Sequence, residues 1–475
     1  MLLPMSGAIA TGNPHTTEAA RLILEAGGNA VDAAIAACLA SFVAEPLLAS
    51  AGGAGMMCAS IPGRDPVVVD FFSAMPGLGA GPQERDFQGV EIDFGSATQM
   101  FHVGRGSAAA PMALPGLALA SEHLGTMPLR DVVAPSVSLA KKGASLTPES
   151  ADVFGLLWPI NLLDDATSRV YSDSAASPEA GFCKAMPGYA ELLQAFGEEE
   201  GTPAYFREEV LRSFGPDRGG CLTEKDLEAK PQLVAPRVAK LNAHTLFVSP
   251  RLGGRLLALI VQTLAASPSV ESGAELRRIA AACRKGSRAK GDEKALGSTT
   301  HISVVDGKGG AASVTLTNGE GCGYIVPGTD VQLNNFCGEE DLHPGGFFTH
   351  SPGTPLPSMI APTLARNPDG SLLALGSGGA NRIRSVVAQA LYGVLVQGKS
   401  LKEAILAPRV HAEENAVWFE ALDGFREAKE ALQGDFERVF DFPERAFFFG
   451  GVHAARGGDF SAFADPRRGG KALVL

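Results

Sequence analysis

Three threonines and an asparagine are the residues of this sequence whose types and spacing are best suited to chemistry. Thr299 and Thr300 open a stretch of alternating apolar and polar residues, and Thr317 and Asn318 end the next one. This alternation predicts a β-hairpin whose open end brings hydroxyls and an amide together. A hydroxyl beside a proton acceptor can attack a carbonyl as a nucleophile. The alternative is a solvated threonine ladder, because threonine is common in strands.

The register of the hairpin decides which threonines face each other. With a four-residue glycine-rich turn, Asp306 lies opposite Ala311, and Thr300 then lies opposite Thr317. A slip of one residue would instead place Thr299 directly opposite Thr317. In both registers the hydroxyls stay within hydrogen-bond reach.

A second motif follows a short predicted strand at 372–375. Gly376-Ser-Gly-Gly379 is a predicted tight turn that leads into an amphipathic helix over 381–397. Backbone N–H groups at a helix N-terminus, unhindered by side chains, can stabilise an oxyanion or a phosphate. The alternative is a turn that only lets a strand pack against a helix, which is an ordinary use of glycine.

The sequence around Thr299 resembles a known processing site. Ser298-Thr-Thr-His-Ile-Ser-Val-Val-Asp306 is similar to the TTHxSVVD motif of the gamma-glutamyltranspeptidase family, whose small subunit begins at the first threonine. Further motifs of that family follow the same order along most of the chain: GGNAVDAA (27–34), VAEP (43–46), GGAG (52–55), LPG (114–116), GTMPL (125–129), GGCLTEKDL (219–227), VPG (326–328), LNN (333–335), SMIAPT (358–363) and GSGGANRI (376–383).

The resemblance implies the fold and the processing of an N-terminal-nucleophile hydrolase. That fold is a four-layer αββα sandwich, an α/β (α+β) architecture, made as one precursor that cuts itself. Cleavage before Thr299 would give a large chain, 1–298, and a small chain, 299–475, interlocked in one structural unit. No Pro/Ser-rich linker separates the sequence into modules.

The resemblance also assigns roles to four residues. Thr299 would be the nucleophile and, through its free α-amine with a reference pKa of about 8, its own base. Thr317 matches the family threonine that hydrogen-bonds the nucleophile, and Gly378 and Gly379 match the glycines whose amides form the oxyanion hole. The acyl group would pass from Thr299 to water or to an amine, with no metal and no cofactor.

Two aromatic residues stand where the family has polar substrate contacts. The strand that carries a carboxylate-binding arginine in a DFRE-like stretch reads Asp70-Phe-Phe-Ser73 here, so Phe72 occupies the arginine's place. The polar residue expected after LNN, which contacts the substrate's amino group, is Phe336. A phenyl ring offers a carboxylate nothing comparable to a bidentate guanidinium. We therefore expect retained catalytic machinery and an acyl site for a less charged or differently anchored group.

Other substrate contacts are carried over with changes. Glu339 keeps the family's acidic residue, Ser358 is what remains of a serine pair, and Asn318 begins a loop shorter than the family's, which leaves its role open. Arg382 or Arg384 could supply a displaced anion anchor. The alternative is that Arg382 belongs to the family's RI pair and that Arg384 is solvated.

The remaining polar and sulfur-containing residues near these motifs have structural interpretations. His301 is expected to order its strand rather than to act as a base. Cys322 and Cys337 are expected to pack near the pocket, and Glu45 and Asp32 to cap or pair beside buried helices.

Alternating helices and strands are predicted to position these residues. A helix is expected from Thr16 or Thr17 as its cap to Ala26, and a second, buried one over 30–43 with Asn29 as its cap. The segment 160–187 lacks periodicity and is expected to be loop. Strands and helices mixed in both halves favour stacked α and β layers.

Composition and charge exclude several functional classes. Asp and Glu total 52 against 40 Lys and Arg, a net charge of −12, which disfavours nucleic acid and anionic membranes as partners. The seven cysteines form no CxxC motif, so neither a zinc site nor a disulfide framework is expected. No stretch has the length of a membrane span or the pattern of a signal peptide. We expect a cytoplasmic protein with a small-molecule amide substrate. The alternatives left open are a periplasmic or secreted protein whose signal peptide was removed, and assembly as a homodimer.

Three functions therefore compete. The first is a self-processing enzyme that acts on gamma-glutamyl amides. The second is an acylase or amidase for a non-glutamyl acyl group, of the cephalosporin-acylase or small-amide type. The third is an unprocessed, non-catalytic binding protein, against which the intact Thr299, Thr317 and Gly378-Gly379 argue.

Overall fold

The computed structural model describes residues 7–81, 84–93, 98–266, 272–290, 298–343, 345–422 and 428–475. Two large sheets dominate it, and every strand pair within them is antiparallel. The larger sheet has the order β22 (Lys471–Val474), β1 (Gly7–Thr11), β11 (Thr299–Asp306), β12 (Ala311–Thr317), β2 (Ala54–Ser60), β3 (Val67–Phe71), β8 (Gln232–Val234). The smaller has the order β21 (Ser461–Ala464), β20 (Val452–Arg456), β16 (Leu372–Ser377), β15 (Thr363–Arg366), β10 (His244–Val248), β9 (Arg237–Leu241).

The two sheets pack face to face through buried polar contacts as well as apolar ones. Ser303 of β11 donates to the carbonyl of His453 in β20, and Ser313 of β12 donates to the carbonyl of Leu375 in β16. These bonds satisfy carbonyls that two stacked sheets would otherwise bury.

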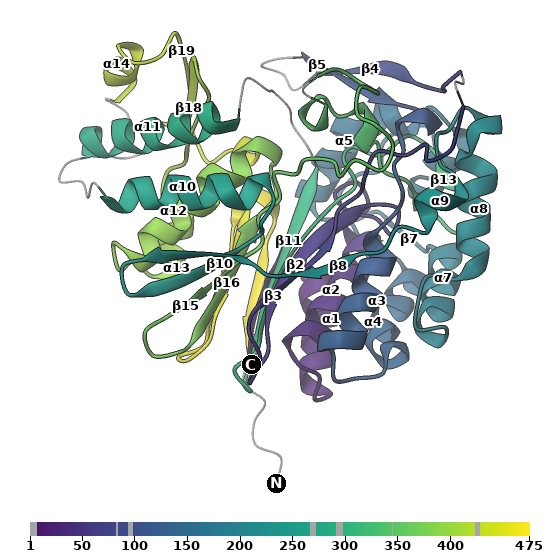
Figure 1. Cartoon of the computed structure of the whole chain (residues 1–475), viewed down its shortest axis with the longest axis horizontal. Helices are drawn as coiled ribbons and strands as arrows, with labels where there is room; N and C mark the ends of the chain where they lie inside the picture. The colour runs from purple at the N-terminus through teal and green to yellow at the C-terminus, as the bar shows by residue number, and fades with distance from the viewer. Residues whose placement is uncertain are drawn as a thin grey trace.

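Helices cover the outer face of each sheet (Figure 1). On the larger sheet lie α1 (Pro14–Glu25), α2 (Ala30–Ala44) and α3 (Ala113–Leu124), with α4 (Leu129–Lys142) packed on α2; on the smaller lie α10 (Leu252–Ala266) and α12 (Ile383–Leu395). The order of layers is helix, sheet, sheet, helix. The predicted four-layer αββα sandwich is confirmed.

The sheets also interleave the two halves of the chain. In the larger sheet β11, β12 and β22, from the segment after residue 298, lie among β1, β2, β3 and β8, from the segment before it. Because β1 pairs with β11 and β12 with β2, neither segment could form this sheet alone.

Local capping explains where the first helices begin. Asn13 caps α1 by accepting from the amide of His15, so the predicted caps Thr16 and Thr17 are wrong by one turn. Pro14 at the first helical position fits this earlier start. Asn29 caps α2 as predicted, and Asp32 completes a capping box by accepting from the amide of Asn29.

The remaining elements lie outside the two central sheets. The segment expected to be loop contains the end of α5 and the whole of α6, where Asp164 caps a short helix by accepting from Thr167. The polar composition of this segment gives α6 no apolar periodicity from which it could be predicted. The other helices and strands are α5 (Pro148–Asn161), α6 (Asp165–Tyr171), α7 (Pro187–Glu198), α8 (Ala204–Phe214), α9 (Glu224–Leu227), α11 (Ser272–Lys290), α13 (Leu401–Leu406), α14 (Ala428–Gln433), β4 (Gln88–Asp93), β5 (Thr98–Val103), β6 (Ala144–Ser145), β7 (Cys183–Lys184), β13 (Ile325–Val326), β14 (Val331–Gln332), β17 (Val410–Ala412), β18 (Ala416–Glu420) and β19 (Arg438–Phe442).

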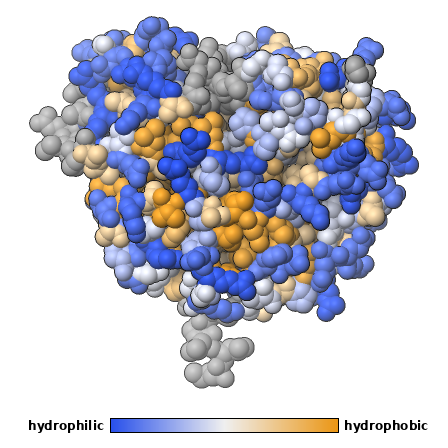
Figure 2. Space-filling view, viewed as in Figure 1, coloured by the Kyte–Doolittle hydropathy of each residue, from blue (hydrophilic) through white to orange (hydrophobic). Residues whose placement is uncertain are grey.

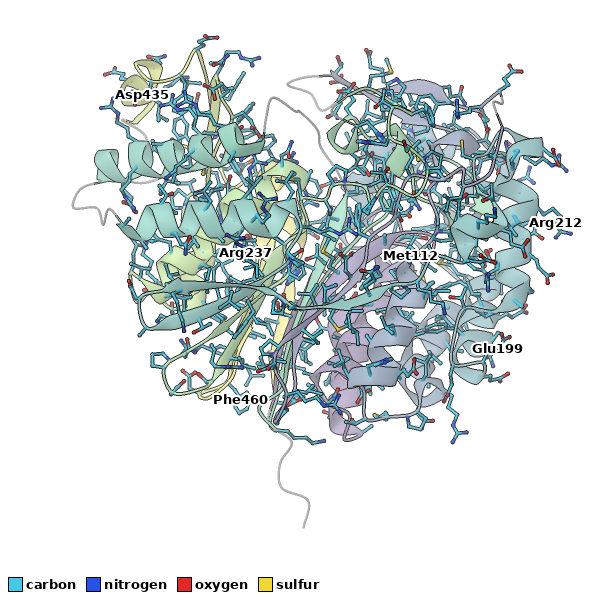
Figure 3. All side chains as sticks on the ribbon, in the orientation of Figure 1. Met112, Glu199, Arg212, Arg237, Asp435 and Phe460 are labelled. Carbon is cyan, nitrogen blue, oxygen red and sulfur yellow. The ribbon has the colours of Figure 1, made fainter. Side chains whose placement is uncertain are left out.

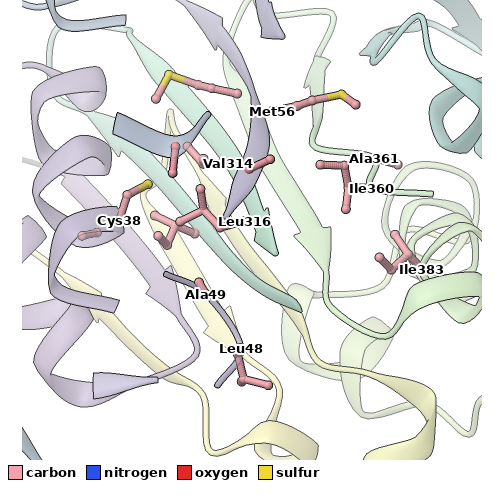
Figure 4. Close-up of a cluster of buried hydrophobic side chains, with 14 of the residues drawn as sticks. Cys38, Leu48, Ala49, Met56, Val314, Leu316, Ile360, Ala361 and Ile383 are labelled. Atoms are coloured by element: carbon pink, nitrogen blue, oxygen red, sulfur yellow. The ribbon is translucent and has the colours of Figure 1, made fainter. Parts of the chain in front are cut away.

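The hydrophobic core follows the strands of the central hairpin on both faces. Figure 4 shows Cys38 of α2 on one side of Val314 and Leu316, and Ile360 and Ile383 on the other. All five are buried, and burial of apolar surface is the main favourable term in folding. On the face seen in Figure 2, hydrophilic residues form most of the rim and apolar patches lie toward the middle. Among the described residues, no helix combines the length and apolarity needed to cross a bilayer.

Candidate active site

The hairpin register places two of the predicted catalytic threonines side by side. Thr299 is the first residue of β11 and pairs with Thr317, the last residue of β12. The register with Asp306 opposite Ala311 is therefore wrong, and the slip of one residue holds. The cause is Asp306, whose carboxylate accepts from the amides of Lys308 and Gly310 and so belongs to the turn.

The hydroxyl of Thr317 contacts the peptide bond that precedes Thr299. Its Oγ1 donates to the carbonyl oxygen of Ser298 over 2.6 Å and accepts from the amide of Gly319 over 3.1 Å. A hydrogen bond to a carbonyl oxygen draws electron density from its carbon. The Ser298–Thr299 peptide is thus activated toward attack in a largely buried position.

The glycine turn lies against Thr299 from the second sheet. A methyl group added at Gly378 would lie 2.1 Å from the carbonyl oxygen of Thr299, so only glycine allows this approach. Gly379 has φ +117°, a conformation that other residues rarely adopt. The structure therefore brings Gly378, and with it Gly379, to the start of β11.

Asn318 continues the strand end at Thr317. It is fully buried, and neither its amide nitrogen nor its amide oxygen has a hydrogen-bond partner among the described residues. Buried polar atoms are nearly always paired with protein, water or ligand. Asn318 thus offers both a donor and an acceptor beside Thr317.

A row of four residues crosses the sheet from Thr299. Thr317 pairs with Thr299 and with Ala54, while Gly55 pairs with Phe71, which sets Phe72 beside Ala54. With neighbouring strands about 4.8 Å apart, Phe72 begins about 14 Å from Thr299. The small side chain of Ala54 lies between them.

Phe72 and Phe336 form an aromatic wall at the end of this row. Their rings stack with centroids 5.1 Å apart and planes at 26°. Both residues are buried. The stack is therefore an apolar surface at the positions where the family has polar substrate contacts.

The sequence did not reveal that a guanidinium lies on this wall. Arg251 lies 5.6 Å from the centroid of the Phe72 ring. It donates to Asp70 over 2.7 Å and to the carbonyl of Leu356 over 2.7 Å. Because 181 residues separate Arg251 from Asp70, only the fold brings them together.

The other predicted substrate contacts lie around the same row. Glu339 packs on the loop after Thr317, since a methyl group at Gly319 would lie 2.6 Å from its Oε1. Ser358 is buried; its hydroxyl accepts from the amide of Ile360 and its carbonyl from the amide of Gly253. The bond from Gly253 places Ser358 against the start of α10.

Two predicted anion anchors are occupied by protein groups. Arg384 is fully buried and donates to Glu413 and Asn381, so the prediction that it could be solvated is wrong. Arg382 is buried, and its Nε donates to the carbonyl of Phe448. Arg384 is thus held by protein groups, and an anion-binding role for Arg382 stays a prediction.

His301 and the cysteines have the structural roles expected of them. The ring of His301 bonds the hydroxyls of Thr315 and Ser303, and burial holds its pKa well below the usual value. A neutral imidazole with both nitrogens engaged orders the strand. Cys322 and Cys337 are buried.

A buried carboxylate lies directly beneath β11. Thr300 donates to Oε1 of Glu45 over 3.0 Å, and burial raises the pKa of Glu45 to about 7. Asp32, by contrast, caps α2 and accepts from Thr126. No group of three or more metal-ligating side chains occurs within the residues that the structure describes.

Comparison with known proteins agrees with this geometry. The family model for gamma-glutamyltranspeptidase matches residues 16–284 and 265–475. "Acylase ACY 1 proenzyme" of Pseudomonas sp. (strain SE83) is 26% identical over 462 residues, covering 86% of this chain and 82% of that protein. "Glutathione hydrolase proenzyme" of Bacillus subtilis (strain 168) is 25% identical over 481 residues, covering 85% and 80%.

A solved structure shares the whole fold. The crystal structure of cephalosporin acylase from Bacillus halodurans superposes with a TM-score of 0.82 at 20% identity, covering 99% of this chain and 96% of that one. The family match extends over nearly the whole sequence, on both sides of Thr299. The chain therefore belongs to the gamma-glutamyltranspeptidase family.

Proposed function

We propose that this chain is a self-processing amidohydrolase or acyltransferase whose nucleophile is Thr299. The observation that carries the proposal is the 2.6 Å hydrogen bond from Thr317 to the carbonyl of Ser298. It polarises the one peptide bond whose cleavage would turn Thr299 into a chain end.

Processing would begin with attack of the Thr299 hydroxyl on the carbonyl carbon of Ser298. The Ser298–Thr299 C–N bond breaks as a C–O ester bond forms, and the released nitrogen takes up a proton. Water then hydrolyses the ester, which leaves a carboxylate on Ser298 and a free α-amine on Thr299. The products are the chains 1–298 and 299–475.

Turnover would use the same hydroxyl with the new amine as its base. The amine accepts the hydroxyl proton while the oxygen attacks the substrate amide. Negative charge develops on the substrate oxygen, and the amides of Gly378 and Gly379 would stabilise it. The leaving amine takes the proton, and water or an acceptor amine releases the acyl group from Thr299.

Asn318, Glu339 and Ser358 would contact the substrate around this centre. The unpaired amide of Asn318 supports its part, because a bound amide or carboxylate could satisfy both of its atoms. A gamma-glutamyl amide is the substrate class that family membership favours.

A second candidate is the hydrolysis of an amide with a non-glutamyl acyl group. The Phe72–Phe336 stack favours it, because these rings stand where a carboxylate and an amino group would need polar partners. The similarity to a protein named acylase points the same way. In that case the aromatic wall would receive an apolar part of the acyl chain.

Denaturing electrophoresis, N-terminal sequencing and a substrate panel test the proposal. We expect two fragments of the purified protein, the smaller beginning at Thr299, and release of aniline from at least one of the gamma-glutamyl, glutaryl and butanoyl anilides. The first anilide reports the glutamyl activity, and the other two report the alternative. A single intact band without turnover would instead indicate a non-catalytic binding protein.

A further inference from the structure

The turn that lies against Thr299 has a strained backbone. Gly379 and Ala380 both have positive φ values, +117° and +46°. This left-handed conformation is unfavourable for alanine and persists only where the surrounding structure holds it. The next residue, Asn381, is buried, and its side-chain oxygen accepts a hydrogen bond.

A buried guanidinium supplies that bond. Arg384, the second residue of α12, donates from Nη1 to Oδ1 of Asn381 over 3.1 Å and from Nη2 to Oε1 of Glu413 over 2.9 Å. Its side chain is fully buried. One planar group therefore connects the strained turn to the residue that follows β17.

Glu413 is fixed by more than this ion pair. It accepts from Nε2 of His411 over 3.0 Å and from the hydroxyl of Ser287. Burial alone would raise the pKa of Glu413, but the hydrogen bond from His411 and the charge of Arg384 hold it well below its usual range. Glu413 is therefore an ionised, threefold-bonded partner for Arg384.

His411 completes the network as a neutral donor. Burial lowers its pKa to about 4. Its Nδ1 lies 2.9 Å from the hydroxyl of Ser385. With the Ser385 hydroxyl donating to Nδ1, the proton on Nε2 is directed to Glu413.

The carboxylate of Glu413 also bonds a residue that precedes the predicted cleavage site. Ser287 lies on α11, which a second pair, Arg288 with Glu414, and a third, Arg277 with Asp435, hold against the later part of the chain. Figure 3 shows Asp435 at this corner of the molecule. Glu413 thus stays anchored from both segments.

We propose that Arg384, held by Glu413, is a positioning residue that fixes the Gly378–Gly379 turn through Asn381. This inference rests on the proposed function of the turn as an oxyanion site. It assigns Arg384 no contact with substrate: its task is to keep two backbone amides aimed at one point while charge develops there.

The first test replaces Arg384 by Met. We expect kcat to fall by about 10²-fold with KM nearly unchanged, because a small displacement of oxyanion donors affects the transition state most. Affinity for butylboronic acid, which forms a tetrahedral anion on a hydroxyl nucleophile, should fall in parallel. Arg384→Lys keeps the charge but lacks the planar fork that holds both partners in fixed directions, so we expect an intermediate kcat.

A double variant separates positioning from stability. Glu413→Gln leaves the Arg384 charge buried without its counter-charge and should lower the melting temperature. Arg384→Met combined with Glu413→Gln removes both charges, so stability should recover while kcat stays as low as in Arg384→Met. Glu414→Gln, which breaks the neighbouring pair with Arg288, is the matched control and should change neither quantity appreciably.

Hydrogen–deuterium exchange tests the inference independently of activity. In folded Arg384→Met, the amides of 377–382 should exchange faster, while those of β11 stay protected. Unchanged exchange at 377–382, or a kcat that follows only the melting temperature, would overturn the inference. Absence of turnover in the unmodified protein would refute the proposed function instead, and the exchange result would still decide the role of Arg384.

Discussion

The two ends of the row that crosses the larger sheet differ in what holds them. At the Thr299 end, backbone register and hydrogen bonds set the geometry, with Thr317 bonded to the carbonyl of Ser298. At the Phe72 end, a stacked aromatic pair with an arginine on one face sets it. Side chains can be exchanged at the second end without disturbing the register of the first. Under the proposed function, reactivity and acyl selectivity would therefore be separable in this molecule.

Removing the hydroxyl of Thr299, the proposed nucleophile, should have the largest effect and tests the first end alone. Thr299→Ala lacks the attacking oxygen, so we expect an uncut chain and no measurable amide turnover. Electrophoresis and an anilide assay measure both. Thr299→Ser, which keeps a hydroxyl, should restore cleavage; a Thr299→Ala protein that still cut itself would contradict the nucleophile assignment.

Removing the polarising hydroxyl should have the next largest effect. Thr317→Val keeps the shape of the residue but leaves the Ser298 carbonyl without its donor, so self-cleavage should slow by about 10²-fold. The decrease of the intact band with time measures the rate. Thr317→Ser is the matched control and should cleave at close to the normal rate. Equal rates for Val and Ser would show that the bond does not assist cleavage.

The second end can be changed without touching the first. Phe72→Arg offers a guanidinium to a substrate carboxylate, so kcat/KM for a gamma-glutamyl anilide should rise by about 10-fold, while self-cleavage stays unchanged. Phe72→Leu controls for loss of the aromatic stack. Arg251 lies close to this ring, so its positive charge would repel an arginine at position 72. We therefore expect a larger gain in the Arg251→Met background, and we expect this difference to be greatest at low ionic strength. No gain in either background would contradict the proposal that the Phe72–Phe336 wall contacts the acyl group of the substrate.

The smallest effect concerns the buried carboxylate beneath the Thr299 end. Burial raises the pKa of Glu45 from 4.5 to about 7, so the folded state holds this proton more tightly than the unfolded state. The contribution of Glu45 to stability therefore falls as pH rises from about 4.5 to about 7, by roughly 3 kcal/mol. Glu45→Gln should lose this pH dependence in urea unfolding curves at pH 5 and pH 8. An unchanged pH profile would show that Glu45 is already ionised at pH 5.

The sequence predicted the elements of the fold better than the contacts between them. The αββα layers, the cap at Asn29 and the aromatic wall all followed from local patterns or from resemblance. The hairpin register did not, because the turn chemistry of Asp306 shifts it by one residue. Alternation of apolar and polar residues cannot fix a register that the turn decides.

Long-range polar pairs could not be predicted from the sequence at all. Arg251 meets Asp70 across 181 residues, and Arg384 meets Glu413 only because β17 returns beneath α12. A charged residue in a sequence is more often exposed than buried, so the sequence leaves a solvated Arg384 as an alternative. Only the folded structure shows that Glu413, the counter-charge of Arg384, lies beside it in the interior.

The central claim is that Thr299 carries the acyl group as a chain end. Mass spectrometry of the protein quenched in acid during turnover of an anilide tests it most directly. We predict that the peptide beginning at Thr299 carries the acyl mass, and that in the uncut Thr299→Ala protein the peptide spanning residues 298 and 299 carries none. Steady turnover with residues 298 and 299 still joined, or an acyl mass on any other residue, would contradict this account.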